Sequence, residues 1–173
     1  MKIAITGKMC SGKTTLSNYL VSIEPRFQVF SFGKKVKEVA SDLFQMDPNF
    51  KDRSLLTSIG QKMREIEPDV WANYVINQTK DLNYCIIDDL RYQNEYELLA
   101  KEGWKIIQLN ISKELQEQRI QSIYPENYQD HLKNRTHASE RNSFQWINGG
   151  PDLIIDTSQD REDIQKLIHS FIQ

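Results

Sequence analysis

Two spacings of apolar residues alternate along this chain. Apolar residues that are contiguous or at every second position are typical of strands, whereas apolar residues three and four positions apart form one face of a helix. The first pattern predicts strands at residues 2–6, 28–32, 84–88, 104–110 and 152–156. The second predicts helices at residues 13–23, 35–44, 55–66, 69–75, 94–101, 115–123, 138–147 and 164–171. Residues 124–136 are polar and aperiodic, so we expect a mobile loop there.

Strands that alternate with helices predict an α/β fold, with a five-stranded parallel sheet between two helical layers. A length of 173 residues fits one domain over residues 1–173. The helices between the second and third strands form an insertion at residues 33–80, with Asp52 expected to cap one of them. Ligands of such sheets bind beyond the carboxyl ends of the strands, which directs attention to the residues that follow each strand.

Composition narrows the classes of partner. The sequence is 39 % hydrophobic with a formal net charge of −2 and a pI near 5.9, and it has no basic run, so nucleic acid is not expected as a partner. No apolar run is long enough to cross a membrane, and the N-terminus lacks the features of a signal peptide. Two cysteines, Cys10 and Cys85, are too few for a disulfide framework, and we expect a cytoplasmic protein.

The segment that follows the first predicted strand reads Gly-Lys-Met-Cys-Ser-Gly-Lys-Thr over residues 7–14, which matches the phosphate-loop pattern G-x-x-x-x-G-K-[ST]. Glycines let the backbone approach phosphate oxygens, and the N-terminus of the following helix adds positive charge. Lys13 is expected to reach the β- and γ-phosphates, and the Thr14 hydroxyl to bind Mg²⁺. The predicted nucleotide-binding residues are Gly7, Met9, Cys10, Ser11, Gly12, Lys13, Thr14 and Thr15.

An acidic pair ends the third predicted strand. In phosphate-loop proteins a carboxylate at this place holds the magnesium ion, often through water. We assign the metal role to Asp88, with the choice between Asp88 and Asp89 left open, because the sequence does not show which carboxylate faces the loop. Asp89 is expected to accept a hydrogen bond from the acceptor or to orient Arg91.

Three classes of phosphate-loop protein compete. A GTP-dependent switch reads guanine with [NT]-K-x-D, but residues 79–82 are Thr-Lys-Asp-Leu, with the aspartate one place early. A motor ATPase usually has Glu beside the strand-end Asp, whereas Asp89 stands here. A small-molecule kinase needs a second anion pocket and a lid that excludes water. Residues 33–80, with Lys37, Arg53 and Arg64, and a lid-like segment at residues 119–137 fit these two needs.

Several segments resemble phage-type deoxynucleoside monophosphate kinases. Residues 88–95, Asp-Asp-Leu-Arg-Tyr-Gln-Asn-Glu, are similar to that family's DD-x-R-[FY]-x-NE stretch. Residues 31–37, 53–64 and 68–71 look like its acceptor-binding segments, and residues 137–140 and 152–156 fit its C-terminal part. The resemblance implies transfer of the ATP γ-phosphate to a deoxynucleoside or nucleoside monophosphate, with Mg²⁺. It also implies that Lys8, Lys37, Arg64 and Arg91 contact the acceptor and that Arg119 lies on the ATP side.

The residues themselves support cationic chemistry, because phosphoryl transfer needs two polyanions brought into line. Lys13, Arg91 and Arg119 are the predicted catalytic cations, and the predicted acceptor-binding residues are Lys8, Phe32, Lys37, Arg64, Trp71, Asp89, Arg91 and Glu95.

For many of these residues a purely structural role is an alternative to substrate binding. Phe32 and Trp71 also fit a hydrophobic core, Arg64 a surface ion pair, and Glu95 a helix cap. Arg53 and Arg135 also fit solvated or paired positions. A kinase that resembles dephospho-coenzyme A kinase and a non-enzymatic nucleotide-dependent switch remain alternative functions. The oligomeric state is left open between a monomer and a homodimer.

Overall fold

The computed structural model describes residues 1–47, 52–126, 128–134, 144–147 and 149–173. Its strands are β1 (Lys2–Gly7), β2 (Gln28–Phe30), β3 (Cys85–Leu90), β4 (Lys105–Asn110) and β5 (Leu153–Asp156). Its helices are α1 (Lys13–Ile23), α2 (Phe32–Phe44), α3 (Arg53–Ile66), α4 (Val70–Thr79), α5 (Gln93–Lys101), α6 (Lys113–Ile123), α7 (Tyr128–Asn134) and α8 (Arg161–Ile172). These elements confirm the predicted alternation.

All five strands pair in parallel in the order β2-β3-β1-β4-β5. The central strand β1 pairs on both sides, with Ile3 opposite Ile86 of β3 and opposite Lys105 of β4. A strand paired on both edges and covered on both faces is buried along its length, and β1 is buried from Ile3 to Gly7. The loop that follows β1 therefore lies at the middle of the sheet's carboxyl edge.

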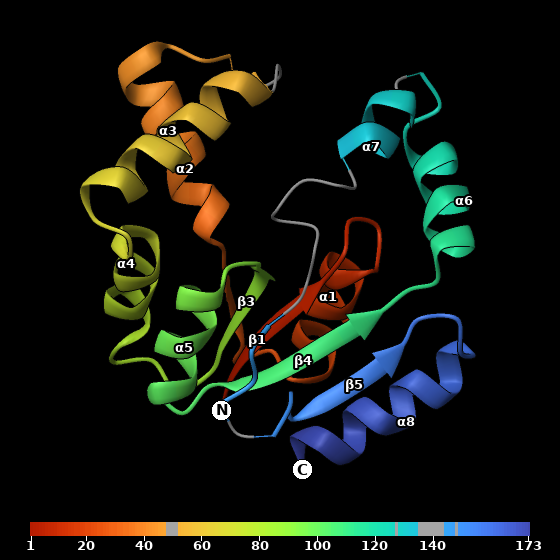
Figure 1. Ribbon diagram of the computed structural model, residues 1–173. Helices are drawn as coiled ribbons and strands as arrows, with labels where there is room; N and C mark the ends of the chain where they lie inside the picture. Colours follow the sequence, from red (N-terminus) through yellow and green to blue (C-terminus); the bar gives the residue numbers. More distant parts are fainter. Residues whose placement is uncertain (48–51, 127, 135–143, 148) are drawn as a thin grey trace.

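Two apolar clusters lie on opposite faces of the sheet and confirm the three layers. Alternation along β1 sends Ala4 to one face and Ile3 and Ile5 to the other. The Ala4 face packs against α2, α3, α4 and α5, while the Ile3 face packs against α1 and α8. Figure 1 shows the sheet between these two groups of helices. Beyond the arrowheads of the strands, α2 and α3 lie on one side and α6 and α7 lie on the other.

The insertion consists of α2, α3 and α4 between β2 and β3, as predicted. Asp52 caps α3, because its Oδ1 accepts a hydrogen bond from Leu55 N at 3.0 Å. The predicted second strand is too long by two residues. Ser31 accepts a hydrogen bond from Lys34 N at 3.0 Å and caps α2, so Phe32 begins a helix instead of ending a strand.

Two predictions near the C-terminal part are wrong within the described residues. The segment expected to be a mobile loop contains the helix α7, at Tyr128–Asn134. The helix predicted at 138–147 is absent at Phe144–Trp146, while residues 138–143 lie outside the described residues. The aromatic spacing there reflects packing on α5, because the rings of Phe144 and Trp146 lie 5.6 and 5.0 Å from the ring of Tyr96. No helix in the described ranges is long and apolar enough to span a bilayer.

Two isoleucines on adjacent strands test which face carries the core. Ile107 on β4 is fully buried, whereas Ile154 on β5 is 53 % exposed. We expect Ile107→Ala to lower the free energy of unfolding by about 2–5 kcal/mol, since it removes buried methyl groups and leaves a cavity. Ile154→Ala should cost less than about 1 kcal/mol. Urea denaturation of both variants measures this, and equal losses would contradict the assigned register.

Candidate functional site

The loop between β1 and α1 has the backbone geometry of an anion cradle. Cys10 and Gly12 adopt positive φ angles of 60° and 100°, and Ser11 N donates to Lys8 O at 3.2 Å. Gly12 is the N-cap of α1, and no side chain caps that helix. The first N–H groups of an α-helix have no acceptor within the helix, so they face the loop together with the positive end of the helix dipole. A phosphate group fits such a helix N-terminus.

Lys13 is held across this loop. Its ammonium donates to Gly7 O at 2.7 Å and to Lys8 O at 2.9 Å. These two carbonyls use two of the three donors of the ammonium and fix its position above the backbone. The sequence prediction that Lys13 serves the phosphates is compatible with this position, and it remains a prediction.

Gly7 is required by close packing under the loop. A Cβ built on Gly7 would lie 2.5 Å from Ser11 Oγ and 3.0 Å from the carbonyl oxygen of Leu109. Ser11 is itself fully buried, and its Oγ has no hydrogen-bond partner among the described residues. The loop therefore has no room to move towards β4. Its backbone N–H groups lie on the side away from that strand.

The two aspartates at the end of β3 have different surroundings. Asp89 accepts hydrogen bonds from the backbone N–H groups of Phe32 and Gly33, each at 2.9 Å, and so anchors the start of α2. Burial raises the pKa of Asp88, and the charge of Asp89 raises it further, while Lys13 and Lys37 lower it. Lys13 of the loop is one of the charges that act on Asp88, whereas both oxygens of Asp89 are bound to the start of α2, which favours Asp88 as the metal ligand.

The donor atoms fit a magnesium ion. Mg²⁺ prefers hard oxygen ligands and usually takes only one or two carboxylates, with water and phosphate oxygens completing its shell. The Thr14 hydroxyl at the start of α1 and the Asp88 carboxylate at the end of β3 are such ligands. Within the described ranges no group of three or more His, Cys, Asp or Glu forms a closed metal cage. This donor set suits a metal that is held partly by phosphate.

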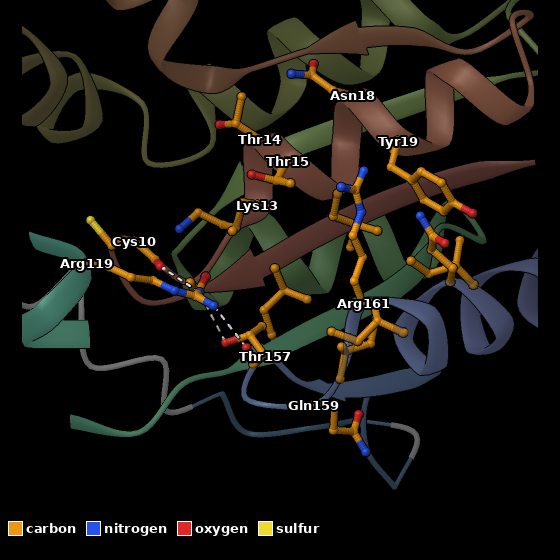
Figure 2. A pocket seen from close by; sticks show the side chains of 18 of the residues that line it. Cys10, Lys13, Thr14, Thr15, Asn18, Tyr19, Arg119, Thr157, Gln159 and Arg161 are labelled. Carbon is orange, nitrogen blue, oxygen red and sulfur yellow. Dashed lines mark hydrogen bonds between the residues drawn. The ribbon is translucent and has the colours of Figure 1, made fainter. Parts of the chain in front are cut away.

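A cavity of about 1000 Å³ opens beside the loop. It is lined by the loop, by α1 and α8, and by residues that follow β5, such as Thr157 and Gln159. Figure 2 shows the Arg119 side chain extending from α6 towards Cys10 and Thr157. Its guanidinium donates to Cys10 O at 3.2 Å and to Thr157 O at 3.0 Å. The predicted ATP-side arginine thus joins the loop to the β5–α8 connection, and the cavity is large enough for a nucleotide.

The sequence analysis missed several polar residues that line this cavity, among them Thr157, Gln159 and Arg161. The available signal was positional, because Thr157 and Gln159 lie between β5 and α8, Arg161 begins α8, and strand ends mark ligand sites. Their residue types carry no motif, which is why the pattern alone did not select them.

Arg64 and Glu95 meet on the insertion side of the loop. Arg64 Nη2 lies 3.1 Å from Glu95 Oε1, and Glu95 is only 2 % exposed. Glu95 Oε2 accepts hydrogen bonds from the backbone N–H groups of Arg91 and Tyr92, each at 3.1 Å. The structure thus contains both alternatives, the ion pair of Arg64 and the helix cap of Glu95. The ion pair does not lie on the surface, because its glutamate is buried. Whether either residue touches an acceptor remains a prediction.

Phe32 and Trp71 lie in the core cluster, each with 3 % of its surface exposed. The indole of Trp71 donates to Gly60 O at 3.2 Å. In this conformation both rings are covered by protein, as the core alternative predicts. Lys8 and Lys37 are exposed on the loop and on α2, in keeping with their predicted contact with an acceptor, which no observation here tests.

A contact between the insertion and α7 was not foreseen. Arg53 Nη2 lies 3.2 Å from His131 Nε2, and His131 is 1 % exposed. The His131 ring stacks on Tyr124, with 3.9 Å between ring centroids. The solvated position considered for Arg53 is therefore replaced by a contact that joins α3 to the lid-like segment. Arg135 and His137 lie outside the described residues.

Comparisons with known proteins agree with this geometry. A family model described as an AAA domain matches residues 3–129. Similar solved structures include a sugar kinase from Janibacter with a TM-score of 0.61 and 12 % identity, covering 99 % of this chain and 93 % of that chain. A gluconokinase from Sinorhizobium meliloti has a TM-score of 0.56 and 12 % identity, with 98 % and 90 % covered. A shikimate kinase from Acinetobacter baumannii, in complex with shikimate, has a TM-score of 0.55 and 19 % identity, with 99 % and 92 % covered.

These likenesses establish a kinase-like fold built on a phosphate loop, and at such identities they establish the fold alone. No curated protein matches the sequence.

The two aspartates should respond oppositely to the loss of charge. Asp89→Asn leaves one oxygen for two N–H donors, and we expect the free energy of unfolding to fall by about 1–3 kcal/mol. Folding raises the pKa of Asp88, so the folded state binds its proton more tightly than the unfolded state and is destabilised when the group ionises at neutral pH. Asp88→Asn should therefore leave stability at pH 7 unchanged or higher. Urea denaturation measures both, and a large loss for Asp88→Asn would give that carboxylate a structural role.

Proposed function

This chain belongs to the phosphate-loop family described as an AAA domain, and we propose that it is an ATP-dependent kinase whose acceptor is a deoxynucleoside or nucleoside monophosphate. The observation that carries the proposal is a phosphate loop that contains Lys13, with one cationic region in the insertion and another on α6. Lys37 and Arg64 come from the insertion, while Arg119 comes from α6 and lies against the loop.

The donor side supports binding of a nucleotide triphosphate with Mg²⁺. Lys13 and the first turn of α1 would meet the β- and γ-phosphates, and Thr14 with Asp88 would hold the metal. The metal, when bound, neutralises charge on the phosphate oxygens. Arg119 would add positive charge near the transferred group, in the way of an arginine finger. The cavity beyond it leads between α1 and α8 and offers a place for the base and sugar.

A transferase is favoured over a water-activating ATPase by the role of Asp89. The place where motor ATPases carry a water-activating glutamate is occupied by a carboxylate whose two oxygens hold the start of α2. This carboxylate is committed to positioning the insertion, and the insertion supplies cations for a second anionic substrate. Positioning and charge neutralisation are the main needs of phosphoryl transfer, so no separate base is required.

The choice of a monophosphate acceptor rests on charge and on the resemblance of residues 88–95. A dianionic phosphate needs several cations, and the predicted ones are Lys8 in the loop, Lys37 on α2, Arg64 on α3 and Arg91 after β3. A neutral polyol acceptor would not need them. A phosphate-bearing metabolite such as dephospho-coenzyme A satisfies the same charge requirement and is the second candidate.

We expect ADP release from ATP and Mg²⁺ to accelerate when one or more nucleoside monophosphates are added. A coupled assay over the common ribo- and deoxyribonucleoside monophosphates, with dephospho-coenzyme A as a separate arm, measures this. Acceleration only by dephospho-coenzyme A would select the second candidate. Tight nucleotide binding with no stimulation by any acceptor would overturn the kinase proposal in favour of a switch.

Lys13→Ala should lower kcat/KM by a factor of about 10²–10³ or more, because it removes a preorganised cation from the transferred phosphate. The matched control is Lys166→Ala, since Lys166 is an exposed lysine of α8 paired with Asp163. The control should keep full activity and both variants should melt near the wild-type temperature. Unchanged turnover in Lys13→Ala would remove the phosphate loop from the reaction.

A further inference from the structure

Glu95 is an unusual residue for its position. Among the described residues it is the one carboxylate side chain that is almost completely buried, at 2 % exposure. A buried carboxylate is costly unless hydrogen bonds and a counter-charge compensate it. Both are present here, and they come from two separate parts of the chain, so the residue adds a polar connection between these segments.

The two oxygens of Glu95 divide these contacts. Oε1 accepts from Arg64 Nη2 at 3.1 Å, on helix α3 of the insertion. Oε2 accepts from Arg91 N and Tyr92 N, each at 3.1 Å, in the turn between β3 and α5. One side chain therefore fixes a side chain of the insertion and the main chain that carries Arg91. Both arginines are predicted to contact the acceptor.

Arg64 is held on three sides. Besides its bond to Glu95, Nη1 donates to Gly60 O at 3.2 Å, and the guanidinium carbon lies 4.2 Å from the centre of the Tyr92 ring. A free arginine side chain has about 2 kcal/mol of rotamer entropy to lose on binding a ligand. An arginine that is already ordered loses less, and this preorganisation increases affinity.

We propose that Glu95 is a positioning residue for the acceptor phosphate: without touching substrate, it holds Arg64 and the main chain of Arg91 in the arrangement that receives a phosphate group. The inference rests on the proposed function, because it assumes an acceptor that carries a phosphate. It replaces the direct contact between Glu95 and substrate expected from the sequence, since both carboxylate oxygens face protein donors.

The charge of Glu95 also changes near neutral pH. Burial raises its pKa to about 7, against the lowering effect of the N–H groups of Tyr92 and Arg91 and of the Arg64 charge. The charge of Asp89 on β3 raises the pKa further. Above this pKa the carboxylate accepts from Arg64 and from both N–H groups. As the pH falls through about 7 it gains a proton, its hold on Arg64 weakens, and acceptor binding weakens with it.

The test is Glu95→Gln, which keeps the shape but leaves one oxygen to accept where two are needed. We expect the acceptor KM to rise about tenfold, the effect of one charge-assisted hydrogen bond, while the KM for ATP stays within a factor of two. Glu97→Gln is the matched control, because Glu97 lies on the same helix and contacts Gln93. It should leave both KM values unchanged. An equal rise in both KM values for Glu95→Gln would overturn the proposal.

A double-mutant cycle with Arg64→Ala shows whether Glu95 acts through the arginine. In the Arg64→Ala background, Glu95→Gln should add less than a twofold further rise in acceptor KM. Fully additive effects would overturn the proposal, because they would mean that the carboxylate acts independently of Arg64.

The pH profile supplies a readout that a merely structural role would not change. The ratio of acceptor KM between Glu95→Gln and wild type should fall towards one as the pH drops from 8 to 6, since the wild type loses its own carboxylate charge. Taking a ratio cancels the ionisation of the acceptor phosphate itself. A ratio that is constant with pH would contradict the proposal. If Glu95→Gln does not fold, the same ratio for Arg64→Ala takes its place: it should also fall as the pH drops from 8 to 6, but it should stay above one because the acceptor contact of Arg64 itself is lost.

The two levels of inference fail differently. A wild-type protein that no phosphate-bearing acceptor stimulates overturns the kinase proposal and this inference with it. A wild-type protein that is stimulated, with Glu95→Gln indistinguishable from it, overturns only the role of Glu95.

Discussion

The placement of one backbone turn at the middle of the sheet's carboxyl edge is the constraint on which the rest of the structure depends. Because β1 pairs on both sides, the turn that follows it has β3 on one flank and β4 on the other. Packing of Ser11 and Leu109 beneath Gly7 keeps the turn from moving towards the core. Its N–H groups and the start of α1 then face outward as a fixed region of positive potential.

The neighbouring strand supplies the opposing charge, and the two aspartates at its end divide two tasks. Asp89 stabilises the first N–H groups of α2, which fixes the insertion relative to the sheet. Asp88 remains near Lys13 and Lys37, at a position where burial already disfavours its ionised form. Functional residues often carry a charge that lowers the stability of the folded state, because stability and function place different demands on the same group. The sequence shows two equal carboxylates, and only the hydrogen bonds distinguish them.

Periodicity predicted most of the fold because this chain is locally consistent: the apolar spacing, the helix cap at Asp52 and the strand-ending Gly7 agree with one another. The phosphate loop was also predictable, since its function depends on residue types at fixed spacing. The failures have physical causes. The apolar run at residues 28–32 predicts a strand that ends at Phe32, but Ser31 caps α2, so Phe32 begins a helix. Phe144 and Trp146 suggested a helix, yet they pack on Tyr96 from an irregular segment. Thr157 and Gln159 line a cavity through position alone, which residue type does not encode.

The acceptor side illustrates a general requirement of a site that gathers cations for two phosphate-bearing molecules. Like charges repel, so cations gathered for a phosphate favour open conformations before substrate arrives unless an opposite charge compensates them. Glu95 supplies such a charge to Arg64, and the low dielectric around its buried carboxylate strengthens the attraction. The same burial raises the pKa of the carboxylate to about 7, so its negative charge is progressively lost as the pH falls through that value. A solvent-exposed glutamate would stay ionised over a wider range of pH but would hold the arginine less firmly. The burial of Glu95 therefore favours firm positioning of the cations over insensitivity to pH.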